Sequence, residues 1–304
     1  MKGFGTVVTG TLVAGTLKVG ETVAVMPSAQ EYRIRGLQVH GRSVETATAG
    51  QRTAVNLQGA EKASLRRGDT ITLPGSIDPT FLIDARLQVL PGAPRPLVQR
   101  ARIRLHFGTS EILARAIIRG RDTLKPGEEG MVQFRLESPG MAPPRDRFVI
   151  RSYSPIVTFG GGDLIDTHPS KHKKNSPEIT GQLEIMAGTD LHQSTLLLLR
   201  EGGLGGLEEK ALATRLNISR REALSILESL TDKGAVRIPL KPPLFLHGDT
   251  VESFEAASLD YLRAYHRQEP LKAGLSREER QSRTGRAAGT ACPSPLERLK
   301  HSGG

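Results

Sequence analysis

Two glycine-rich segments are the first places in this sequence where phosphate chemistry could occur. A nucleotide-hydrolysing site of the phosphate-loop kind needs the pattern G-x-x-x-x-G-K-[ST], whose backbone amides and lysine hold the phosphates. The sequence does not contain this pattern. Residues 160–162 precede Asp163 and Asp166, whose carboxylates disfavour a bound anion, and residues 202–206 join two expected helices. We therefore expect a turn at the first segment and a connector at the second.

Cysteine and histidine offer no better catalytic or metal site. Cys292 is the single cysteine, which excludes an internal disulfide and a multi-cysteine zinc site, and its surroundings hold no base beside it. His168 and His172 have the spacing of two metal ligands on one helix, but Pro169 interrupts that helix. We expect no catalytic residue and no metal site in this chain.

The charge distribution favours a polyanionic partner such as RNA. The formal net charge is +10; residues 1–187 hold 25 Lys and Arg against 17 Asp and Glu, a surplus of 8, and residues 188–304 hold 17 against 15, a surplus of 2. Binding to phosphates releases condensed counterions and so favours association. A basic surface that only maintains solubility is the alternative. No apolar run approaches the roughly 20 residues of a membrane-spanning helix, so we expect a cytoplasmic protein without a membrane partner.

Alternation of apolar and polar residues predicts a first half made mainly of β-strands. Short strands separated by glycines predict a small closed β-barrel over residues 1–76, and a second strand-rich block predicts another over residues 77–168. Residues 169–187 open with a polar, basic stretch bounded by prolines, which predicts a linker.

The second half of the sequence has a helical period. Residues 188–250 predict three helices and two short strands, the composition of a winged helix. Ser219 is the expected N-cap of the third helix, and Gly234 its expected end. Residues 251–283 predict a partial second winged helix, and residues 284–304 have no periodicity and predict a disordered tail.

The third helix of the winged helix has more than one interpretation. In a transcription regulator it would enter a DNA major groove, with Arg215, Arg220 and Arg221 near its start reaching bases or phosphates. In an adaptor it would contact RNA or protein. A solvated helix start also accounts for these arginines.

Residues 2–11 resemble the opening of the second domain of translational GTPases of the elongation factor Tu class. Related blocks follow at the spacing of that family, at residues 15–21, 37–41, 49–57 and 65–69. Within them, residues 39–41 and 50–52 resemble the selenocysteine-specific branch more than elongation factor Tu itself. Blocks that resemble the third domain of this branch lie at residues 104–115, 146–151 and 154–162. The resemblance covers residues 1–283 and implies a fold that is mainly β and then α, with two tandem translation-factor β-barrels, a winged-helix (helix-turn-helix) domain and an incomplete second one.

The resemblance also implies roles for particular residues. It puts Arg52 in the pocket for the selenocysteinyl group, with His40 nearby. A selenol is ionised at neutral pH where the hydroxyl of serine is not, so a fixed guanidinium attracts the first and gains little from the second. A surface arginine at a barrel turn is the alternative for Arg52. The residues expected to contact nucleic acid are Lys2, Arg35, Arg104, Arg115, Arg151, Lys171, Lys173, Lys174, Arg220 and Arg221.

The function implied by the resemblance is that of a selenocysteine-specific translation elongation factor, which delivers selenocysteyl-tRNA to the ribosome at recoded UGA codons. The family begins with a domain that binds GTP and Mg, and no such domain is expected here. We therefore expect tRNA binding without a cofactor, no enzyme activity in this chain, and contact with a selenoprotein mRNA hairpin only if further winged helices are present. The alternatives are another translation factor of the Tu or initiation type, and a winged-helix DNA-binding regulator.

Overall fold

The computed structural model describes residues 5–171, 177–231 and 233–268, which divide after Thr180 into two compact units. Lys2, Lys173 and Lys174 lie outside the described residues. So do the predicted tail at residues 284–304 and the part of the predicted second winged helix beyond Gln268.

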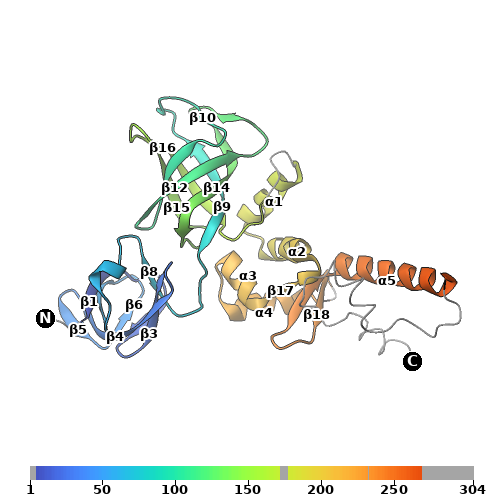
Figure 1. Ribbon diagram of the computed structural model, residues 1–304, viewed down its shortest axis with the longest axis horizontal. Coiled ribbons are helices and arrows are strands. Elements are labelled where there is room, and N and C mark those ends of the chain that lie inside the picture. Colours follow the sequence, from blue (N-terminus) through green and yellow to red (C-terminus); the bar gives the residue numbers. More distant parts are fainter. Residues whose placement is uncertain (1–4, 172–176, 232, 269–304) are drawn as a thin grey trace. The chain divides into compact units, whose positions relative to one another are not determined.

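The first barrel consists of short antiparallel strands around one apolar core (Figure 1). Its main sheet has the order β1-β7-β4-β3-β8, with β5 paired to β4, and β2 pairs with β6 in a separate ribbon. The strands are β1 Thr6–Thr11, β2 Thr16–Lys18, β3 Thr22–Met26, β4 Gln30–Val39, β5 Arg42–Val44, β6 Thr46–Thr48, β7 Arg52–Leu57 and β8 Thr70–Thr72, with the 3-10 helix η1 Lys62–Ser64 before β8. Leu17 and Ala47 of the ribbon belong to the same core as the main sheet. The core is thus enclosed, although within the described residues the hydrogen-bonded strand path is open and not the closed ring that was expected.

The second barrel is a closed antiparallel ring with the strand order β11-β12-β14-β9-β16-β15 (Figure 1). The strands are β9 Thr80–Val89, β11 Arg102–Phe107, β12 Ser110–Ile118, β14 Glu129–Gly140, β15 Arg147–Ser152 and β16 Thr158–Asp166, with the short pair β10 Leu97–Val98 and β13 Thr123–Leu124. Phe134 and Phe148 meet edge to face inside the ring, with 5.2 Å between ring centroids. Inward residues of β11 alternate with outward ones, since Ile103, Leu105 and Phe107 are buried.

The glycine triplet at residues 160–162 lies inside strand β16, so the turn expected there is wrong. A Cβ atom on Gly162 would lie 1.8 Å from the carbonyl oxygen of Arg86, and one on Gly160 would lie 2.4 Å from that of Gln88. On the other side, a Cβ on Gly161 would lie 2.7 Å from the carbonyl oxygen of Phe148. These glycines allow close approach of the strands that close the ring, rather than a reversal of the chain.

The predicted linker at residues 169–187 is only partly irregular, because α1 Pro177–Ala187 is helical. Proline is favoured at the first position of a helix, where its missing N–H costs nothing. Leu183 and Met186 recur at helical spacing and are buried. The proline-bounded stretch predicted a linker, whereas Pro177 begins a helix.

The second unit contains a winged helix with two clear N-caps. Its elements are α2 Leu191–Gly202, η2 Gly203–Gly205, β17 Leu207–Glu208, α3 Glu209–Leu216, α4 Arg220–Ser229, β18 Ala235–Ile238, β19 Leu244–His247 and α5 Gly248–Gln268. The strands form a sheet in the order β17-β19-β18. The Asp190 side chain accepts hydrogen bonds from the backbone at the start of α2, and Ser219 is the N-cap of α4, as predicted. Helix α4 ends at Ser229 and not at Gly234, whose φ of +117° belongs to the turn before β18.

Candidate nucleic-acid interfaces

Arg52 begins β7 and points outward from the first barrel. The residues after it alternate, with Thr53, Val55 and Leu57 buried. Arg52 therefore shares the outer face with its cross-strand partner Thr11 of β1, which is also exposed.

His40 lies at the same end of this sheet. His40 and Gly41 form the two-residue turn between β4 and β5, with φ angles of 51° and 77° that are typical of a type I′ hairpin. Val39 pairs with Thr53, so continuing the register by one residue puts His40 beside Arg52. The backbone thus brings together the two residues predicted for the selenocysteinyl pocket, and both side chains are exposed.

The loop before Arg52 is held by a set of hydrogen bonds. The Leu12 amide donates to the Gln51 carbonyl at 3.0 Å, and the Gly50 amide donates to the Leu12 carbonyl at 2.8 Å. The Gln51 side chain accepts from the Thr48 amide at 2.8 Å. Within the described residues, no hydrogen bond or ion pair engages the Arg52 side chain. A fixed backbone therefore carries a guanidinium that is available to an anion.

A row of three arginines crosses the outer face of the second barrel. Arg102 of β11 is the cross-strand partner of Arg115 of β12, and Arg115 is the partner of Arg135 of β14. We call these three residues the arginine row. Directly paired residues project on the same side of a sheet, so the three guanidinium groups share one face.

Two carboxylates partly neutralise this face. Glu137 accepts two hydrogen bonds from Arg102, at 2.9 and 2.7 Å, and Glu111 forms an ion pair with Arg104. The guanidinium of Arg104 lowers the pKa of Glu111, and that of Arg102 lowers the pKa of Glu137. The Glu137 carboxylate in turn raises the pKa of Arg102.

Three arginines of the face have no carboxylate partner among the described residues. They are Arg115, Arg135 and Arg151, the last being the cross-strand partner of Arg104. Arg115 reaches only the Arg100 carbonyl, at 3.5 Å, and the Nε atoms of Arg135 and Arg151 have no hydrogen-bond partner. Five arginines thus face two glutamates, a positive surplus suited to a phosphate backbone.

Arg104, Arg115 and Arg151 of this face were predicted to contact nucleic acid, whereas Arg102 and Arg135 were not predicted. The alternation over residues 100–107 contained the signal for Arg102, since it puts Arg102 and Arg104 on one side of a strand. No local signal points to Arg135, because its place beside Arg115 depends on the pairing of β12 with β14.

The remaining candidates are scattered. Lys171 is exposed after β16, and Arg35 is exposed at the irregular pairing of β4 between Ile34 and Gly36. Arg220 and Arg221 open α4 and are exposed, but Glu222 and Glu228 are exposed on the same helix. The exposed arginines of α4 are balanced by these glutamates, which does not favour phosphate binding by this helix alone.

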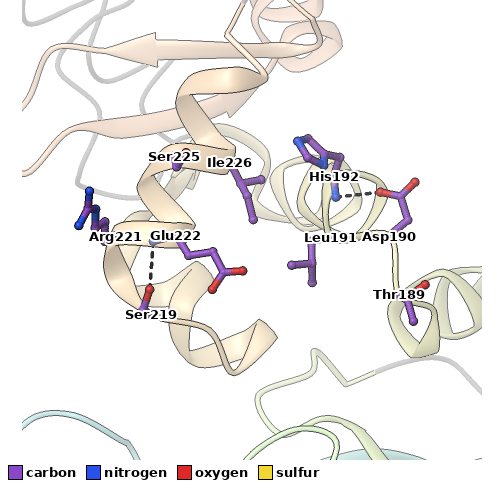
Figure 2. A pocket seen from close by; sticks show the side chains of 9 residues that line it. All are labelled: Thr189, Asp190, Leu191, His192, Ser219, Arg221, Glu222, Ser225 and Ile226. Carbon is purple, nitrogen blue, oxygen red and sulfur yellow. Dashed lines mark hydrogen bonds between the residues drawn. The ribbon is translucent and has the colours of Figure 1, made fainter.

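A hollow of about 580 Å³ lies between the starts of α2 and α4 (Figure 2). Two of its polar side chains have internal partners: the Asp190 carboxylate accepts from the His192 amide at 3.0 Å, and the Ser219 hydroxyl accepts from the Glu222 amide at 3.1 Å. The His192 ring lies 3.2 Å from the Ser229 hydroxyl. Asp190 and Ser219 cap their helices. The Ser229 hydroxyl donates to the Ile226 carbonyl at 2.7 Å, so its proton is directed at the backbone and not at His192.

Within the described residues, no cluster of three or more His, Cys, Asp or Glu side chains is arranged to hold a metal ion. No helix in the same part of the chain is long and apolar enough to cross a membrane.

Family models match three segments of the chain. Residues 5–72 match elongation factor Tu domain 2, residues 84–171 match the beta-barrel domain of selenocysteine-specific elongation factor, and residues 259–301 match the winged helix of elongation factor SelB. The last match extends past residue 283, where the predicted second winged helix ended. Together with the barrels and the winged helix of the structure, these matches define a translation factor of the elongation factor Tu superfamily type.

Curated relatives specify the branch. A selenocysteine-specific elongation factor of Desulfomicrobium baculatum is 37% identical over 94% of this chain and 45% of its own length. One of Escherichia coli strain K12 is 27% identical over 91% of this chain and 42% of its own length. The fold is similar to the crystal structure of a bacterial selenocysteine-specific elongation factor, EF-Sec, with a TM-score of 0.72 and 20% identity over 93% of this chain and 43% of that one. The chain is thus similar to selenocysteine-specific elongation factors over nearly all of its own length, spans less than half the length of these relatives, and has the predicted fold class.

Proposed function

We propose that this chain is the tRNA-binding body of a factor that delivers selenocysteyl-tRNA to the ribosome at recoded UGA codons. The observation that carries the proposal is the basic outer face of the second barrel, on which Arg115, Arg135 and Arg151 have no carboxylate partner among the described residues. Phosphate contacts by such residues supply affinity for RNA without reading its sequence.

Arg52 is proposed to bind the selenocysteinyl group, with His40 in its neighbourhood. Arg52 supports this role because its backbone is fixed at the start of β7 and its exposed side chain has no internal partner in the described part of the chain. A selenolate gains a full ionic contact with a guanidinium, whereas a serine hydroxyl gains only a neutral hydrogen bond. Charge is therefore the property by which Arg52 would select the correct aminoacyl group.

The family is one of translation GTPases, but the residues of this chain do not fit GTP and Mg. The sequence has no phosphate-loop pattern, and the backbone carbonyls of neighbouring strands fill the space around the glycine triplet of β16. We derive no hydrolytic step for this chain. GTP and Mg belong to the proposed function of a longer protein that includes a nucleotide-binding domain.

The proposed partners are selenocysteyl-tRNA and the ribosome, in the cytoplasm. A selenoprotein mRNA hairpin is a further proposed partner, through winged helices that include the segment matched at residues 259–301. The balanced charge on α4 supports a connecting role for the first winged helix rather than a role in phosphate binding.

The test measures binding of the full chain to a selenocysteine tRNA transcript and to duplex DNA of equal phosphate number over a range of salt concentrations. The proposal predicts tighter binding to the tRNA, and a logarithm of affinity that falls linearly with the logarithm of the salt concentration. Tighter binding to DNA would favour the winged-helix regulator. We call the outer face that carries Arg102, Arg104, Arg115, Arg135 and Arg151 the arginine face. Affinity for tRNA that does not depend on salt would contradict RNA binding by this face.

A further inference from the structure

Tyr153 stands at one end of the arginine row. Strands β11 and β15 pair Arg104 with Arg151 and Ile103 with Ser152. Continuing this register by one residue sets Tyr153 opposite Arg102, on the outer face that also carries Arg115 and Arg135. Neighbouring strands are about 4.8 Å apart, so an aromatic ring and three guanidinium groups follow one another across the sheet at roughly that interval.

The Tyr153 ring is held in place by two of these arginines. The guanidinium carbon of Arg102 lies 4.5 Å from the ring centroid, and that of Arg104 lies 5.6 Å from it. Both distances are within the range of cation–π attraction. Arg102 is itself fixed by its two hydrogen bonds to Glu137. The ring is thus ordered before any ligand arrives, which reduces the entropy lost on binding.

The same ring remains open to a ligand. Tyr153 is 43% exposed, and Ile156 and Val157 of the connection between β15 and β16 are 50% and 41% exposed. Tyrosine with flanking apolar groups offers a flat surface of the kind on which nucleic-acid bases stack. The arginine row would contact only phosphates, so it would bind paired and unpaired RNA equally well. A base that is stacked and paired within a duplex cannot place its face on an external ring, so Tyr153 suits a nucleotide that is unpaired.

We infer that Tyr153 is a stacking site for one unpaired base of the bound RNA, whose adjoining phosphates lie along the arginine row. This inference rests on the proposed function only in that it requires RNA to bind the arginine face. It does not depend on the selenocysteinyl group. The ligand class is an RNA duplex that ends in, or is interrupted by, an unpaired nucleotide.

The experiment compares two RNA probes with the full chain, a blunt duplex and the same duplex with a single unpaired 2-aminopurine nucleotide at one end. Stacking on an aromatic ring contributes about 1 to 3 kcal/mol per base, so the overhang should tighten binding by about 5- to 150-fold and should change the fluorescence of the 2-aminopurine. Tyr153→Ala should abolish both effects and leave the affinity for the blunt duplex unchanged. Tyr153→Phe, which keeps the ring, should retain both.

Two further variants separate the possible failures. Leu90→Ala removes an apolar side chain of the same barrel with the same exposed fraction, 43%, and should behave as the wild type. Arg135→Ala should weaken binding of both probes. If the wild type binds both probes equally and the fluorescence does not change, the inference is overturned while the proposed function stands. The exposed connection between β15 and β16 would then be a surface for a protein partner. If neither probe binds, RNA binding by the arginine face fails as well.

Discussion

Arg104 and Arg151 are direct cross-strand partners on β11 and β15, yet only Arg104 is paired with a carboxylate, that of Glu111. Two like charges side by side on a sheet repel each other. An anion that lies over the pair would offset this repulsion, and this is the state that the proposed function requires. The same reasoning applies to Arg115 and Arg135 along the arginine row.

Replacing Arg115, Arg135 and Arg151 together with alanine should weaken tRNA binding and reduce its salt dependence. Each phosphate contact contributes about 0.7 to 0.9 to the slope of log affinity against log salt concentration, so three lost contacts should reduce the slope by about 2 to 3. Fluorescence anisotropy over a salt series measures both quantities.

The matched control removes three exposed arginines elsewhere in the first unit, at Arg66, Arg67 and Arg95. It changes the net charge by the same amount and should leave most of the slope intact. Equal slopes for the two triple variants would mean that overall charge, and not the arginine face, binds the RNA.

Replacing Glu111 and Glu137 with glutamine should lower the thermal midpoint of unfolding near neutral pH. Neighbouring arginines hold both folded pKa values below the ordinary value of 4.5, so the stabilisation is present above that pH and is lost as the pH falls through the folded pKa values. The effect should be small and screened by salt, because the side chains of both pairs are partly exposed. A difference between wild type and variant that persists in acid would contradict the ion-pair explanation.

Phe134→Ala should destabilise the second barrel by about 3 to 5 kcal/mol, because it empties the centre of the core and removes the edge-to-face contact with Phe148. Urea unfolding measures the loss. Phe81 lies on β9 of the same barrel but is 56% exposed, and Phe81→Ala should change the free energy of unfolding by no more than about 0.5 kcal/mol. Similar losses for the two variants would show that the core assignment is incorrect.

Gly162→Ala should cost at least about 1 to 3 kcal/mol, because the new methyl group would lie 1.8 Å from the Arg86 carbonyl oxygen and force β16 away from β9. Gly92 has no heavy atom within 4 Å of the corresponding position, so Gly92→Ala is the control and should be nearly neutral. Thermal unfolding of the two variants side by side tests whether the triplet closes the barrel.

The features that the sequence predicted well have a local cause. Alternation shows which side of a strand faces the core, and Ser219 caps α4 through its own side chain, so residues 102–107 and the start of α4 could be read directly.

The features that were missed depend on contacts between distant segments. Residues 160–162 have a glycine composition that is typical of turns, and only the approach of β9 and β15 explains why glycine is needed within a strand. Arg135 lies in the arginine row because of the register between β12 and β14. Pro177 begins α1, and the buried residues of this helix, Leu183 and Met186, lie in its second half. Strand register and the pairing of distant segments cannot be derived from the pattern of one sequence.

The central claim is that Arg52 recognises the charge of the selenocysteinyl group. The direct measurement is competition between selenocysteyl- and seryl-tRNA with the same tRNA body, using a longer form of the protein that includes the nucleotide-binding domain. Arg52→Ala should reduce the preference for selenocysteyl-tRNA by about 10- to 150-fold, since a hydrogen bond to a charged group is worth about 1.5 to 3 kcal/mol. Arg67→Ala, an exposed arginine of the same barrel, should keep the preference. An unchanged preference in the Arg52 variant would contradict the pocket assignment and leave Arg52 as a surface residue of the barrel.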